Sequence, residues 1–255
     1  MSNVFVIAWM TFVEARRNRI LWSLLFFCLA LVLTSFLFQE VTVATLDRVI
    51  RDVGLATLNG FGMLLAIFLG VSVVTREIER RTVYVLLSKP LGRGRYLLGK
   101  LLGVWFTLVI ALSAMFLAFL VENAAYAGNT PAILFQAFWL MLVELLVVTS
   151  FSILASTFTS SAMSAFMTAS LVVAGHLTTD IYFFSSKSKS ILIKRSGAAL
   201  FYLLPNLEKL NLKTDASLLR SVPAAQVCSA TAYGLVYVAA FFVLSLAFFR
   251  RRDLK

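Results

Sequence analysis

Residues 132–158 read AILFQAFWLMLVELLVVTSFSILASTF, an almost unbroken apolar run with one acidic residue, Glu144, near its centre. A helix needs about 20 apolar residues to cross the hydrocarbon core of a bilayer, which is about 30 Å thick. This run is longer than that. A strand of a membrane barrel would alternate apolar and polar residues, so the run predicts a membrane-spanning helix.

Similar apolar segments lie on both sides of this run along the chain. They occupy residues 20–38, 55–74, 101–121, 162–184 and 227–249. Together with the first run they predict six transmembrane helices, which take up more than half of the chain. The sequence therefore predicts an all-α membrane protein built as a single transmembrane domain over residues 1–255. No stretch is left that could hold a soluble ATPase or kinase domain.

The composition of the chain supports this class. Of its 255 residues 60% are hydrophobic and only 14% are charged, whereas about a quarter of the residues are charged in a soluble domain. The net charge of +11 would suggest nucleic acid in a soluble protein. In a membrane protein, Lys and Arg collect in cytoplasmic loops. Their distribution predicts that both termini are cytoplasmic, and no nucleic-acid partner is expected.

Residue types that carry catalysis or bind metals are scarce. The chain has one histidine and two cysteines, Cys28 and Cys228, with no CxxC pair, so neither a multi-histidine metal site nor a disulfide framework is expected. Residues 94–100 match the GxxxxGK pattern of a phosphate-binding loop. However, Leu101 follows where that loop needs Ser or Thr, and no strand precedes it. We predict no catalytic residue, metal or cofactor, and therefore not an enzyme in itself.

The N-terminal residues 3–18 predict a helix that precedes the first span. Its apolar residues share one face and include Val4, Phe5, Ala8, Trp9 and Phe12. Such a helix would lie in the inner membrane interface, as amphipathic helices do. The alternative is a simple N-terminal extension of the first span.

Two polar residues lie deep inside predicted spans. An ionised carboxyl at mid-bilayer costs about 2.5–3.5 kcal/mol on insertion scales, so Glu144 should face the bundle, a cavity or a partner, or be protonated. His176 lies at similar depth on the next span. The two side chains could contact each other, or each could bond separately to backbone or hydroxyl groups.

The loop at residues 75–100 begins with charged residues, continues with an apolar turn, and is broken by Pro90 and Gly92. A short amphipathic helix in such a loop would give a soluble partner a rigid element to bind. A basic loop that faces anionic lipid has the same composition. The residues by themselves leave both interpretations open.

Several motifs in and beyond this loop resemble the permease subunits of type-2 ATP-binding-cassette (ABC) exporters. Their order and spacing span nearly the whole chain, and Arg81 departs from the glycine usual in that family. The branch most similar includes the permeases for copper-site maturation of nitrous oxide reductase and for gliding motility. The motifs read ERRT at 79–82, LLSKPLGR at 86–93, LGK at 98–100, YLLPNL at 202–207 followed by Asn211, and FFRRRDL at 248–254.

The resemblance implies partners and a coupling site. Two permease subunits would pair as a homo- or heterodimer in the lipid of a bacterial inner membrane, and separate ATPase subunits would dock beneath them. A periplasmic or lipoprotein partner is a further expectation. The turn at residues 159–161 would be a second, smaller contact with the ATPase. The main contact would be a cytoplasmic coupling helix with Glu77, Glu79, Arg80, Arg81 and Thr82.

The resemblance predicts a permease that couples ATP hydrolysis to movement of an unidentified substrate out of the cytoplasm or inner membrane. A membrane scaffold that transmits ATPase force to an envelope machine, without moving a solute, would have the same fold and the same loop. An integral-membrane lipid transferase is a third alternative, but the chain lacks the paired polar motifs that such an enzyme needs.

Overall fold

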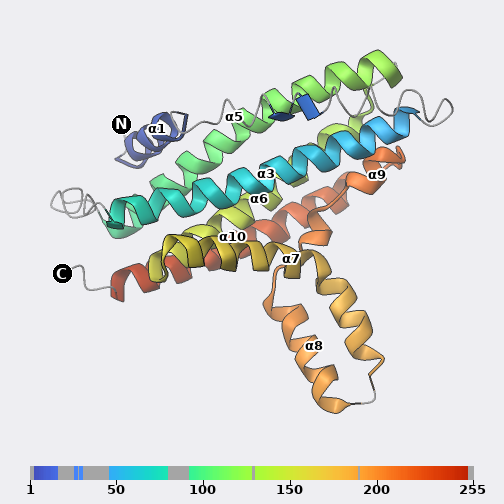
Figure 1. Cartoon of the computed structure of the whole chain (residues 1–255). Coiled ribbons are helices and arrows are strands. Elements are labelled where there is room, and N and C mark those ends of the chain that lie inside the picture. Colours follow the sequence, from blue (N-terminus) through green and yellow to red (C-terminus); the bar gives the residue numbers. More distant parts are fainter. Residues whose placement is uncertain are drawn as a thin grey trace.

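A computed structural model describes residues 3–16, 26–27, 29–30, 46–79, 92–127, 130–188 and 190–251. Every regular element in this part of the chain is helical, as predicted (Figure 1). The elements are α1 (Asn3–Arg16), α3 (Leu46–Glu79), α5 (Arg93–Ala127), α6 (Ala132–Phe158), α7 (Ser161–Ser186), α8 (Ile191–Leu203), the 3₁₀ turn η1 (Leu207–Leu210), α9 (Lys213–Ser217) and α10 (Ala224–Arg251).

Five of these helices, α3, α5, α6, α7 and α10, are long and apolar enough to cross a membrane. They contain the predicted spans from the second to the sixth, and α6 has the predicted bounds. Of the predicted first span at 20–38, only residues 26–27 and 29–30 are described. Five spans are therefore supported, and the sixth stays a prediction.

Helix α3 is longer than the predicted second span because it begins before the membrane-spanning stretch. It starts at Leu46 and continues without a break to Glu79. An ion pair in its first turns joins Arg51 Nη2 to Asp47 Oδ2 at 2.6 Å. Asp47 also lies in the first turn, where a negative charge complements the helix dipole.

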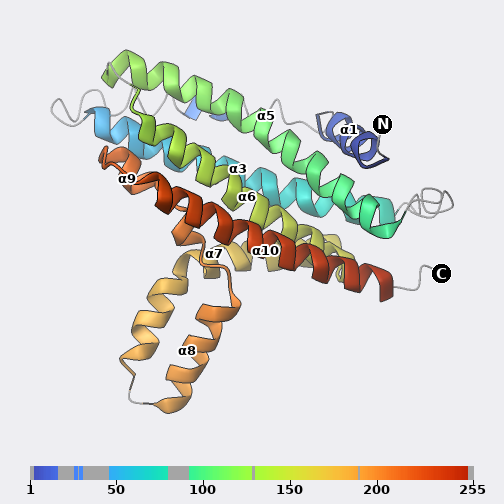
Figure 2. The same cartoon turned by 180° about the vertical axis from the view of Figure 1, so that it is seen from behind.

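Helix α6 lies at the centre of the bundle, between α3 and α10 (Figures 1 and 2). It also contacts α5 and α7, and all of residues 140–150 are buried. A helix that is apolar on every side has no preferred outer face and is stable only when it is surrounded. This explains why the opening run shows no helical periodicity.

Small residues allow the helices to pack closely. On α3, a Cβ added at Gly62 would lie 2.9 Å from a Leu145 methyl, and one at Gly70 would lie 2.7 Å from the Ser152 hydroxyl. On α5, a Cβ at Gly103 would lie 2.6 Å from Thr11 Cβ. Close backbone approach of this kind is a main source of helix association in lipid.

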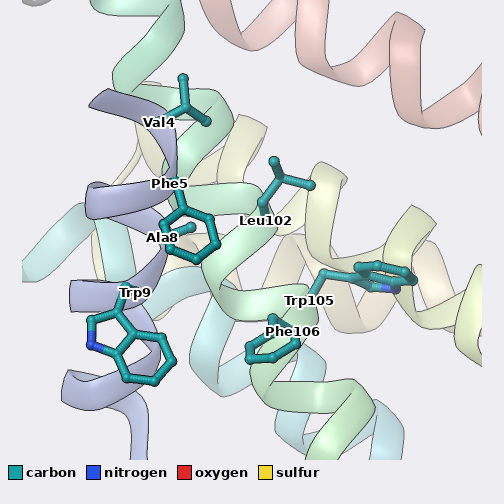
Figure 3. Close-up of a pocket in the computed structure, with 7 residues that line it drawn as sticks. All are labelled: Val4, Phe5, Ala8, Trp9, Leu102, Trp105 and Phe106. Carbon is teal, nitrogen blue, oxygen red and sulfur yellow. The ribbon is translucent and has the colours of Figure 1, made fainter. Parts of the chain in front are cut away.

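Helix α1 packs along the first turns of α5. A groove of about 350 Å³ runs between the two helices, lined on the α1 side by the predicted apolar face and on the α5 side by Leu102, Trp105 and Phe106 (Figure 3). Apolar side chains are also exposed on the opposite side of α1, where Met10 is 64% exposed. The helix is thus apolar on several sides rather than on one, and its position in the membrane interface stays a prediction.

The long connection between the last two spans is folded. Helix α8 and the end of α7 form a hairpin that projects sideways from the bundle (Figures 1 and 2). A Cβ at Gly197 would meet the Ser185 side chain, so the two helices are in close contact. The chain then returns to the bundle through residues 204–218, here called the return segment, which contains η1 and α9.

Buried apolar residues and specific hydrogen bonds hold the return segment in place. Leu207 and Leu210 of η1 are buried in the bundle core. The backbone N–H of Asn206 donates to the Tyr233 hydroxyl at 2.8 Å, and Arg51 Nε donates to the carbonyl oxygen of Ser217 at 3.3 Å. The YLLPNL motif therefore joins the hairpin to the bundle.

Candidate functional site

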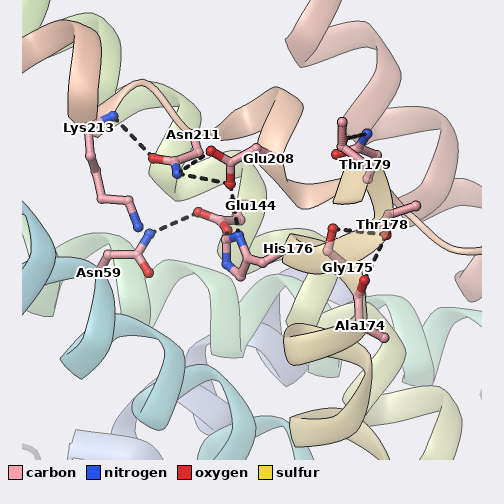
Figure 4. A network of polar contacts seen from close by, with 11 residues as sticks. Asn59, Glu144, Ala174, Gly175, His176, Thr178, Thr179, Glu208, Asn211 and Lys213 are labelled. Atoms are coloured by element: carbon pink, nitrogen blue, oxygen red, sulfur yellow. Dashed lines mark hydrogen bonds and ion pairs between the residues drawn. The ribbon is translucent and has the colours of Figure 1, made fainter. Parts of the chain in front are cut away.

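The carboxyl group of Glu144 is fully buried where three membrane-spanning helices meet (Figure 4). Asn59 on α3 donates through Nδ2 to Glu144 Oε2 at 2.9 Å. From α7, Nε2 of His176 lies 3.1 Å from Glu144 Oε1. This second contact is at ion-pair distance but lacks the alignment of a good hydrogen bond. One carboxyl group thus ties α3, α6 and α7 together.

The structure brings together the two polar residues singled out in the sequence. Of the two alternatives for Glu144 and His176, it shows the direct contact. The contact has a physical reason, because a carboxyl group at mid-bilayer is costly unless polar groups surround it. The amide of Asn59 and the imidazole supply these groups without any lipid contact.

His176 has a second carboxyl neighbour on its other side. Its Nδ1 lies 3.4 Å from Glu208 Oε2, in η1. Glu208 also accepts two hydrogen bonds from Asn211 Nδ2, at 3.0 and 3.1 Å. The imidazole therefore bridges a carboxyl group of the bundle core and one of the return segment.

Exposure rises along this chain of contacts. The side chain of Glu144 is 1% exposed, that of His176 is 26% exposed, and that of Glu208 is 50% exposed. The network thus leads from the core of the bundle to its surface in two steps. Lys213 of α9 adds a cation near His176, and its backbone N–H donates to Asn211 Oδ1 at 3.1 Å.

A glycine beside His176 makes this arrangement possible. A Cβ at Gly175 would lie 2.8 Å from Leu207 Cγ and 3.0 Å from the carbonyl oxygen of Pro205. Only a residue without a side chain lets the return segment pack this closely on α7. The same close approach brings Glu208 within reach of the imidazole.

The network does not have the geometry of a metal site. The two ring nitrogens of His176 point at different carboxyl groups, so the three side chains do not converge on one centre. No group of three or more His, Cys, Asp or Glu side chains that could hold a metal ion occurs in the described residues. The arrangement suits the binding and transfer of protons.

Sequence reasoning missed Asn59 and Glu208. Asn59 is a lone polar residue inside the predicted second span, and that signal was available. Glu208 carried no such signal, because it lies in a long connection whose fold depends on the rest of the bundle.

The residues predicted to contact the ATPase fall at the edge of the described chain. Glu77 and Glu79 belong to the last turn of α3, whereas Arg80, Arg81 and Thr82 lie outside the described residues. The predicted coupling helix therefore also lies outside them. Helix α3 ends at the same end of the bundle as α1 begins and α10 ends (Figure 1).

The predicted second contact, at residues 159–161, is a short turn between α6 and α7, as expected. Phe158 and Phe248 lie beside it with ring centroids 5.3 Å apart, so the turn lies next to the end of α10. Both predicted contact regions are thus at the same end of the bundle.

Comparison with known families gives one match. A family described as ABC-2 family transporter protein matches residues 5–254, which is nearly the whole chain. No curated protein matches the chain.

Proposed function

The chain belongs to the ABC-2 family of transporter proteins, and from this premise we propose that it is the permease subunit of an ATP-driven exporter. The observation that carries the proposal is the family match over residues 5–254. The five apolar helices long enough to span a membrane agree with it. The permease would move a substrate, so far unidentified, out of the cytoplasm or the inner membrane.

Membership of this family implies a partner ABC ATPase. We propose that Glu77, Glu79, Arg80, Arg81 and Thr82 form its main contact, with residues 159–161 as the second. A second permease subunit, as a homo- or heterodimer, would complete the membrane part. The finer prediction, a branch that resembles the permeases of copper-site maturation and gliding motility, stays a prediction, as does a periplasmic or lipoprotein partner.

Purification from the native membrane tests the function. The tagged full-length chain, extracted in a mild detergent, is expected to co-elute with an ABC ATPase in stoichiometric amount. The complex should hydrolyse ATP after reconstitution into nanodiscs, and mass spectrometry identifies the partner. An untagged membrane is the control for non-specific recovery. Elution of the chain without any ATPase would contradict the proposal.

We propose that the protein lies in the bacterial inner membrane with both termini in the cytoplasm. Single cysteines placed at Ser2 or Lys255, with Cys28 and Cys228 replaced by serine, should react with a membrane-impermeant maleimide only after the cells are permeabilised. A cysteine at the exposed Arg220, near the other end of the bundle, is the matched control and should react in intact spheroplasts. Labelling of either terminus from outside would reverse the topology.

A further inference from the structure

We propose that His176 binds a proton from the end of the bundle where the return segment lies, and that this proton fastens η1 to α7. The proposal rests on the position of the ring between two carboxyl groups, one in the bundle core and one in the return segment. It goes beyond the transport function and does not depend on the partner ATPase.

The chemistry of imidazole makes the two contacts conditional on charge. A neutral ring carries one N–H and can donate to one carboxylate only, whereas an imidazolium ring carries two and can donate to both. In this structure Nε2 faces Glu144 at 3.1 Å and Nδ1 faces Glu208 at 3.4 Å. Both contacts can therefore be hydrogen bonds from the histidine only when the ring is protonated.

The charged groups around the ring come from three elements. Glu144 faces it from α6, Glu208 from η1 and Lys213 from α9, while α3 supplies only the uncharged Asn59 (Figure 4). With both carboxyl groups ionised, a protonated ring and Lys213 balance the two negative charges. Loss of the ring proton leaves an excess negative charge at the junction between the return segment and the bundle.

Deprotonation of the ring breaks its hydrogen bond to Glu208 rather than the one to Glu144. The distance to Glu208 is the longer of the two, and the Glu208 side chain is half exposed, so water can replace the imidazole as its donor. The Glu144 side chain is 1% exposed and has no water to replace the histidine. The ring therefore keeps its single N–H on Glu144 and releases η1. The exposed side of the network provides the route by which the proton enters and leaves.

The direction of the pH effect follows. In acid the ring is charged and η1 is fastened; as the pH rises and the proton leaves, η1 is released. A hydrogen bond to a charged group shifts an equilibrium by about tenfold or more, so we expect the released population to rise about tenfold across the titration.

Pulsed electron–electron resonance measures this release directly. Nitroxide labels are placed on Lys209→Cys in η1 and Val173→Cys in α7, both exposed, in a background with Cys28 and Cys228 replaced by serine. The full-length protein in nanodiscs is compared at about pH 5 and about pH 8, on either side of the usual range for histidine. We expect one short distance in acid and a second, longer one at the higher pH.

Variants identify the responsible group. His176→Gln and Glu208→Gln should each give the same distance distribution at both pH values. Asp180→Asn, on the exposed side of α7 one turn from His176, is the matched control and should keep the full response.

A wild-type distribution that does not change with pH would overturn the proposal, and so would an unchanged response in the His176→Gln protein. If His176→Gln does not give a monodisperse protein, the surface variant Glu208→Gln decides the outcome. Because the measurement needs no ATPase, its failure would leave the proposed transport function untouched.

Discussion

Replacement of Glu144 by leucine is expected to lower the thermal midpoint of the purified protein by about 5–10 °C. The substitution removes the acceptor for Asn59 Nδ2 and the partner of His176 Nε2, both in the bundle interior. A buried donor without a partner costs about 1–3 kcal/mol, and measured interhelical hydrogen bonds in membranes suggest the lower part of that range. Each kcal/mol corresponds to about 2–4 °C in a protein of this size.

Replacement by glutamine separates shape from charge. Glu144→Gln keeps one acceptor oxygen for Asn59 or His176, so we expect about half of the shift in the thermal midpoint. It removes the ionisable group, however, and should impair transport more than expression. Thr149→Val is the matched control, because its hydroxyl is buried on the same helix but bonds only to the carbonyl oxygen of Leu145, at 2.7 Å. Normal transport by Glu144→Gln, with no loss of stability in Glu144→Leu, would make the residue incidental.

Reversal of the charges at the end of α3 is expected to release the ATPase. In the variant Glu79→Arg with Arg80→Glu, the proposed contact would present the wrong charge at each position. Breaking a buried charge pair at an interface costs about 2–5 kcal/mol, which lowers the affinity about 30-fold or more. The ATPase should no longer co-purify, or should hydrolyse ATP without responding to substrate.

The controls for this variant separate coupling from insertion. Neither residue lies in a predicted span, so the amount of permease in the membrane should not change. Removal of the charges at Lys187 and Lys189, in the connection between the last two spans, should leave ATPase binding intact. If the reversed variant binds and couples like the wild type, the loop has no part in the coupling. The interpretation as a basic loop that faces lipid would then stand.

Much of the fold could be predicted from the sequence because the membrane makes it a local property. Backbone groups in lipid must be bonded within their own segment, so an apolar run of sufficient length is a helix wherever its neighbours lie. Helix α6 has the predicted bounds for this reason. The same reasoning marked Glu144, since a carboxyl group in such a run must be shielded.

Other features depended on contacts between residues far apart in the chain. Asn59 and Glu144 are separated by 85 positions, and His176 and Glu208 by 32, so no periodicity could pair them. The folded return segment and the sideways hairpin of α7 and α8 had no local signature either.

The sequence by itself thus determined the helices, their apolar character and the need for a polar partner inside the bundle. Only the tertiary structure decided which partners Glu144 has and that the network extends to the return segment. The physical reason is close packing: glycines at positions such as 70 and 175 matter through the atoms they admit, and those atoms belong to other helices.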